Sequence, residues 1–134
     1  MILAFDYGTQ KIGVASGNML LGTATPLKAL PCKNTQPNWD DIAALLKEWE
    51  PEALVVGLPL NMDGSDSEST ARARKFANRL HGRFGKKVWL VDERLSTREA
   101  RERTGIQKAD SRVDSMAAVI IAEGFFAGDA EAIG

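Results

Sequence analysis

Two short apolar runs limit the fold of this chain more than any other feature. Residues 53–58 (ALVVGL) are apolar throughout, and residues 87–92 (KVWLVD) are apolar between a lysine and an aspartate. Such continuous runs are typical of strands that are covered on both faces, as in parallel sheets. Each run follows a segment with helical periodicity, so we expect β-α-β units with right-handed crossovers and helices on both faces of the sheet.

The first fifteen residues predict a β-hairpin that places a carboxylate at the end of a strand. Residues 2–15 (ILAFDYGTQKIGVA) are two apolar runs around a glycine-containing loop, and a third strand is expected at residues 20–30. Pro26 places this third strand at a sheet edge, because proline lacks the backbone donor of a central strand. We therefore predict an α/β fold with a mixed five-stranded sheet, three antiparallel strands followed by β-α-β-α-β, in a single domain spanning residues 1–134.

Asp6 closes the first apolar run, and two explanations of this carboxylate remain open. It either caps the turn through the backbone, or it needs a partner such as a metal, a ligand or a basic side chain. If the first strand pairs with residues 53–58, Asp6 lies where the connections leave the sheet in opposite directions. Open α/β sheets bind their ligands at such positions.

Further carboxylates are expected near Asp6. Asp92 and Glu93 end the run at residues 87–92, and strand alternation allows only one of them to face the same site. Asp114 lies on the apolar face of a helix predicted from about residue 111 to about residue 126, although it could instead complete a capping box with Ser111. Acids gathered in one crevice repel one another unless they are protonated or neutralised by cations. Oxygen ligands of this kind suit Mg²⁺ or Mn²⁺, and two such ions could activate water against a phosphodiester.

The net charge of −1 conceals an uneven distribution of charged residues. Residues 72–112 contain 13 of the 17 lysines and arginines and carry a net charge of +8, whereas residues 1–71 and 113–134 carry −5 and −4. Four cations fall on one side of the helix predicted over residues 65–84: Arg72, Lys75, Arg79 and Arg83. This basic stripe is either a nucleic-acid contact or an ordinary solvated helix face.

Several absences exclude other classes of protein. No apolar run approaches the ~18 residues of a membrane span, and the N-terminus lacks the pattern of a secretion signal. Cys32 is the only cysteine and His81 the only histidine, which excludes an internal disulfide and a metal site built from several thiols or imidazoles. We expect a cytoplasmic protein with no membrane partner.

Four segments together resemble the YqgF/RuvX family: FDYGTQKIGVA, VVGLPLNMDGS, VDERLST and VDSMAAVII. The resemblance implies a ribonuclease-H-like fold and a nuclease that depends on divalent metal, with its acidic residues at Asp6, Glu93 and Asp114 and with two ions expected. Members of the family are described as Holliday junction resolvases and as nucleases that trim the 5′ end of precursor 16S ribosomal RNA. The implied partners are precursor rRNA or branched DNA, and ribosomal particles, with the chain acting as a monomer or a weak homodimer.

On this interpretation, phosphate contacts come from the basic stripe and from four further cations: Lys11, Arg94, Lys108 and Arg112. Two other hypotheses compete with it. FDYGTQKIG also resembles the first phosphate loop of actin-like ATPases and sugar kinases, which need two such domains around ATP. A nucleic-acid-binding module without turnover would bind RNA in a salt-sensitive manner with no metal requirement. The sequence leaves open the choice of RNA or DNA and of endonuclease or exonuclease action.

Overall fold

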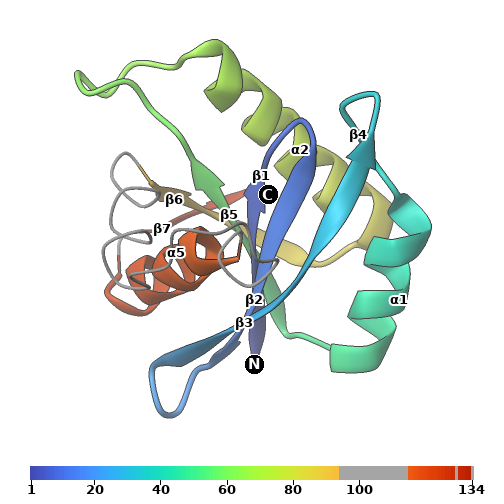
Figure 1. The fold of residues 1–134 in the computed structure, drawn as a ribbon. Helices are drawn as coiled ribbons and strands as arrows, with labels where there is room; N and C mark the ends of the chain where they lie inside the picture. Colours follow the sequence, from blue (N-terminus) through green and yellow to red (C-terminus); the bar gives the residue numbers. More distant parts are fainter. Residues whose placement is uncertain (94–114, 129, 134) are drawn as a thin grey trace, which may run out of the picture.

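The computed structural model describes residues 1–93, 115–128 and 130–133, in which a mixed sheet is covered by helices on both faces (Figure 1). The strands are β1 (Ile2–Tyr7), β2 (Lys11–Asn18), β3 (Thr23–Lys33), β4 (Gln36–Pro37), β5 (Ala53–Leu58), β6 (Lys87–Asp92) and β7 (Ala130–Ile133). The helices are α1 (Trp39–Trp49), α2 (Glu68–Phe84) and α5 (Met116–Phe126). None of these three helices is both long and apolar enough to cross a membrane.

The sheet has the strand order β4-β3-β2-β1-β5-β6-β7 among the described residues. β1 lies between antiparallel β2 and parallel β5, and β6 is parallel to β5, so the predicted hairpins and crossover units are confirmed. The prediction of five strands is wrong, because β4 and β7 add one strand at each edge. β4 has two residues and β7 has four, so neither is long enough to show a clear period in the sequence.

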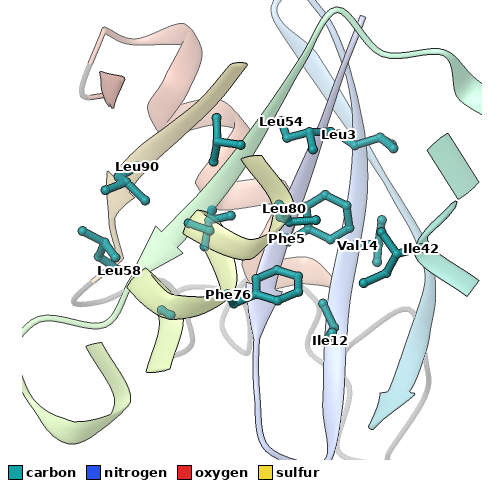
Figure 2. Packing of buried hydrophobic residues seen from close by; sticks show 14 of the residues in the cluster. Leu3, Phe5, Ile12, Val14, Ile42, Leu54, Leu58, Phe76, Leu80 and Leu90 are labelled. Carbon is teal, nitrogen blue, oxygen red and sulfur yellow. The ribbon is translucent and has the colours of Figure 1, made fainter. Parts of the chain in front are cut away.

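One face of the sheet packs against α1 and α2. Leu3 and Phe5 of β1 meet Phe76 and Leu80 of α2 and Ile42 of α1 in the larger buried cluster, which Figure 2 shows from close by. The rings of Phe5 and Phe76 lie edge to face with their centroids 5.9 Å apart, a favourable aromatic geometry. This face therefore contains most of the large buried side chains.

The other face packs against α5 (Figure 1). Ile2 and Ala4 of β1 contact a second buried cluster that includes Ile121 and Ala122 of α5. Because successive side chains of a strand point to opposite faces, the residues of β1 divide strictly between the two helical layers. Asp6 continues the side of Ile2 and Ala4 and faces α5, whereas the next residue faces α2.

In the sequence, Ser65 and Glu68 have the spacing of a capping box, which predicts the start of α2 at Ser65, but the helix begins differently. Ser67 is the N-cap, and it forms a capping box with Thr70. Both hydroxyls also donate to the carbonyl oxygen of Pro59, at 3.2 and 2.8 Å. Ser67 and Thr70 therefore cap the helix and also give the carbonyl group of Pro59 its hydrogen-bond donors. The spacing of residues in the sequence does not reveal this second requirement.

Ser115 ties the start of α5 to the sheet at an irregularity between β2 and β3. The pairing register shifts between Ile12 and Val14, where one strand has an extra residue, as in a β-bulge. The Ser115 hydroxyl accepts from the amide of Val14 at 3.1 Å and donates to the carbonyl oxygen of Leu27. This fully buried side chain thus bridges the two strands and anchors α5 over them.

We expect Ser115→Ala to lower the free energy of unfolding by about 1–3 kcal/mol, because it leaves a buried amide and a partly buried carbonyl without the hydroxyl that joins them. Urea titration followed by circular dichroism measures the change. Ser69→Ala, which removes an exposed hydroxyl from α2, is the matched control and should change stability little. Equal stability of the Ser115 variant and the control would contradict the bridging role.

Candidate functional site

Asp6 and Glu93 meet at the carboxyl ends of two strands on the face that α5 covers. Glu93 follows β6 and is only 8% exposed, and its amide donates to the carbonyl oxygen of Leu58 at 3.0 Å. Its side chain forms a hydrogen bond with the carboxyl group of Asp6 in β1. Two acids that are 87 positions apart in the chain are therefore brought together by the strand order β1-β5-β6.

Gly57 in β5 makes this contact possible. β5 separates β1 from β6, so the two backbones are two strand spacings apart, roughly 9–10 Å. A Cβ atom on Gly57 would lie 2.8 Å from Cδ of Glu93 and would also overlap the side chain of Ile121. The space above a strand residue without a side chain therefore holds the Glu93 carboxyl group as it reaches toward Asp6.

The environment of Asp6 favours its protonated form. Burial raises the pKa of Asp6 above its ordinary value, and the hydrogen bond with Glu93 lowers that pKa by a smaller amount. Two carboxylates cannot form a hydrogen bond unless one of them holds a proton. The pair is therefore stable with a shared proton, or with a cation in place of that proton.

The structure resolves which member of the Asp92–Glu93 pair faces the site. Asp92 is exposed at the end of β6, whereas Glu93 is buried and contacts Asp6. Leu90 belongs to the cluster under α2, and Val91 belongs to the cluster under α5. Continuing this alternation places Glu93 on the α5 face and Asp92 on the opposite face.

Four of the residues that the sequence analysis singled out lie outside the described residues: Arg94, Lys108, Arg112 and Asp114. No group of three or more acidic, histidine or cysteine side chains that could hold a metal occurs in the described ranges. Asp6 and Glu93 are thus the two predicted acidic ligands that the structure places in contact. The nearest described neighbour of Asp114 in the chain is Ser115, which bonds to Val14 beside β1.

The predicted basic stripe lies along α2, on the opposite face of the sheet from Asp6. Arg72 forms an ion pair with Glu68 at 2.6 Å, and Arg79 donates to Oε1 of Gln36 at 3.0 Å. The guanidinium groups of Arg79 and Arg83 lie over the ring of Trp39, at 4.9 and 4.4 Å from its centroid. Lys11 is exposed at the start of β2.

Three residues that shape these sites are not predicted from the sequence: Gly57, Tyr7 and Gln36. Gly57 offers a weak signal, because a glycine inside an otherwise apolar strand often marks a close approach. Tyr7 and Gln36 line a pocket with three residues of the basic stripe: Arg72, Lys75 and Arg79. No sequence signal links Tyr7 or Gln36 to α2, because that proximity arises from strand and loop placement.

Known proteins resemble the chain in both sequence and fold. The model of the RuvX family, described as Holliday junction resolvase, matches residues 1–128. A relative from Alcanivorax borkumensis, named "Putative pre-16S rRNA nuclease", is 96% identical over 131 residues, covering 98% of each chain. A relative of the same name from Chromohalobacter salexigens is 56% identical over 134 residues, covering 96% of this chain and 90% of its own.

Solved structures support the predicted ribonuclease-H-like fold. RuvC from T. thermophilus in complex with a Holliday junction substrate matches with a TM-score of 0.56 at 14% identity, covering 98% of each chain. A Fowlpox virus resolvase in complex with Holliday junction DNA matches with a TM-score of 0.54 at 12% identity, covering 95% of this chain and 97% of its own. At such identities the likeness shows a shared fold, and the fold-class prediction is confirmed.

We expect Gly57→Ala to destabilise the protein by about 1–3 kcal/mol, because its methyl group needs the space that the side chains of Glu93 and Ile121 fill. Gly82→Ala in α2 is the matched control, since its added methyl group meets no atom within 4 Å. That control should be neutral or slightly stabilising in a helix. Thermal unfolding of the two variants measures the contrast, and similar melting temperatures would show that the space above Gly57 is not required.

We expect Asp6→Asn to stabilise the protein at pH 8 in EDTA. The pKa of Asp6 is raised in the folded state, so the folded state holds a proton that the unfolded state has already lost. The free energy of unfolding of wild type therefore falls as the pH rises from about 3.8, the ordinary pKa of this carboxyl group, through its raised pKa in the folded state. At higher pH the wild type keeps this deficit in stability. The asparagine variant lacks this deficit, so its advantage over wild type should shrink as pH falls toward 4.

Urea unfolding at pH 4, 6 and 8 measures this difference between wild type and Asp6→Asn. Asp92→Asn is the control, because it removes an exposed carboxylate, and it should show no comparable gain in stability at pH 8. A loss of stability for Asp6→Asn across this whole range would mean that the Asp6 carboxylate is well solvated or paired with a cationic side chain.

Proposed function

The chain belongs to the RuvX family, and from this premise we propose that it is a nuclease that hydrolyses phosphodiester bonds of structured nucleic acid. The observation that carries the proposal is the contact between Asp6 and the buried side chain of Glu93. In this proposal those two residues and Asp114 hold divalent cations, and a water molecule is the nucleophile.

The chemistry of the Asp6–Glu93 pair fits a hard divalent cation. Both side chains offer only oxygen, and burial makes their joint ionisation unfavourable without a positive charge between them. Mg²⁺ and Mn²⁺ prefer carboxylate oxygens, and neither requires a histidine or a thiol. Two such ions, when bound, would lower the pKa of water and stabilise the charge on the leaving oxygen.

Asp114 enters the proposal through its position in the chain. The next residue, Ser115, is buried and bonds to the amide of Val14, and Val14 pairs with Phe5, the residue before Asp6. Ser115, the residue that follows Asp114 in the chain, therefore lies beside the strand that carries Asp6. Together with the family resemblance, this supports Asp114 as the proposed third acidic ligand.

The residues of the site would divide the work between metal binding and substrate positioning. Asp6 and Glu93 would hold the cations in a fixed place, because each lies at the end of a strand of the sheet and Glu93 is held by its backbone bond to Leu58. Phosphates of the substrate would contact Lys11 and the basic stripe of α2. Arg94, Lys108 and Arg112 are further proposed phosphate contacts.

The proposed substrate is precursor 16S ribosomal RNA, cleaved at its 5′ end. The support is the name shared by the relatives that are 96% and 56% identical over nearly the whole chain. A cytoplasmic location and ribosomal particles as partners follow from this substrate, with residues 1–134 acting as one domain, monomeric or weakly dimeric. Four-way DNA is the second candidate substrate, and the description of the family model favours it.

We expect wild-type protein with Mg²⁺ or Mn²⁺ to cleave precursor 16S rRNA, and Asp6→Asn and Glu93→Gln to lose at least about 100-fold in rate, or about 2.7 kcal/mol of transition-state stabilisation. Asp92→Asn removes the neighbouring carboxylate on the opposite face of β6 and should retain most of the activity. Initial rates on the RNA and on a four-way DNA junction, with and without EDTA, measure both the reaction and the substrate preference.

Binding of the cation has its own readout besides cleavage. Mg²⁺ or Mn²⁺ should raise the melting temperature of wild type and of Asp92→Asn, since a ligand that binds only the folded state stabilises it. The melting temperature of Asp6→Asn should not respond. Cleavage by Asp6→Asn at the wild-type rate, or turnover that persists in EDTA, would overturn the proposed metal-dependent mechanism.

A further inference from the structure

A basic pocket lies on the far side of the sheet from the Asp6–Glu93 pair. It is formed between α2 and the turn that joins β3 to β4, and its volume is about 140 Å³. Three cationic side chains line it from α2: Arg72, Lys75 and Arg79. Tyr7, Phe76 and Gln36 form other parts of the wall.

The polar groups of this pocket are held in place before any ligand arrives. The Tyr7 hydroxyl donates to the carbonyl oxygen of Thr35, which fixes the turn against β1. Arg79 is held by its bond to Oε1 of Gln36 and by its stacking on Trp39. A guanidinium that is oriented in advance loses less entropy when it binds an anion.

The charge of the pocket suits a dianion. Glu68 neutralises Arg72 through their ion pair, which leaves the charges of Lys75 and Arg79. Lys75 forms no ion pair or hydrogen bond within the described part of the chain. A phosphodiester carries one negative charge, whereas a phosphate monoester carries about −1.5 to −2 at neutral pH.

The position of the pocket relates it to the acidic site. Tyr7 follows Asp6 directly in β1, and the two side chains point to opposite faces of the sheet. A nucleic-acid strand that crosses the carboxyl end of β1 would therefore reach both places within a few nucleotides. One place offers carboxylates for metal, and the other offers cations and a hydroxyl for phosphate.

We propose that this pocket binds the terminal phosphate monoester of a nucleic-acid strand and so positions that strand end relative to the Asp6–Glu93 site. The inference rests on the proposed nuclease function for the identity of the strand. It adds a site that recognises a strand end to that function. It therefore favours cleavage at a fixed distance from a phosphorylated end over cleavage at an arbitrary internal position.

Equilibrium binding in EDTA tests the pocket without any cleavage. Three single-stranded RNA oligonucleotides of one sequence are compared by fluorescence anisotropy: one with a 5′-phosphate, one with a 3′-phosphate and one with hydroxyls at both ends. A hydroxyl-ended oligonucleotide with one extra nucleotide controls for total charge. We expect one of the two phosphorylated ends to bind about tenfold more tightly than either hydroxyl-ended RNA, as for a charge-assisted contact.

Two variants assign this preference to the pocket. Lys75→Gln removes a cation, and Gln36→Glu adds a carboxylate of nearly the same shape at the partner of Arg79 without removing any cation. Both should abolish the tenfold preference, and both should weaken the binding of the phosphorylated RNA more than the binding of hydroxyl-ended RNA. Lys47→Gln in α1 and Asn78→Asp in α2 make the same charge changes at exposed positions outside the pocket lining and should keep the preference.

Equal affinity for all four oligonucleotides would overturn the inference, as would a preference that survives in both pocket variants. A uniform loss of affinity in the pocket variants, independent of the terminal phosphate, would also overturn it, because the pocket would then hold internal phosphates. Melting temperatures within a few degrees of wild type show that the variants are folded. Since EDTA prevents metal-dependent cleavage, failure here leaves the nuclease proposal standing, and that proposal is tested separately by Asp6→Asn.

Discussion

The contact between Asp6 and Glu93 is the constraint around which this end of the molecule is built. A half-buried and a buried carboxyl group that share a hydrogen bond are stable only with a proton or a cation between them. The contact requires β1 and β6 to flank the same strand, and it requires that strand to have no side chain at Gly57. α5 then covers the pair's face, and Ser115 anchors its start through the irregular pairing of β2 and β3.

The two faces of β1 carry opposite chemistry. Asp6 faces the α5 layer with Glu93, and Tyr7 faces α2 with the arginines and lysine of its basic stripe. The alternation of strand side chains thus separates anionic and cationic groups by the thickness of the sheet, although the residues are adjacent in sequence. Direct ion pairs between the two sets would cancel both charges. Their separation leaves the acids able to bind a cation and the bases able to bind a phosphate.

Much of this arrangement follows from local patterns in the sequence. The apolar runs and the segments of helical periodicity before them predict the central strands and the first two helices, because such periods depend only on nearby residues. The failures are also local in origin. β4 and β7 are too short to carry a period, and Ser67 displaces Ser65 as the cap of α2 because its hydroxyl also reaches the carbonyl of Pro59. The assignment of Asp114 stays a prediction.

The sequence by itself determined the kind of chemistry that is available: strand-end acids, one histidine, one cysteine and a helix with four cations on one side. It did so because residue identity and periodicity are local properties. Only the tertiary structure decided which acid meets Asp6, since Glu93 and Asp92 differ in direction and not in charge. Only the tertiary structure placed the basic stripe behind the sheet with Tyr7 and Gln36. Those relations depend on strand order and on the space that a missing side chain leaves, and neither is encoded within any one segment.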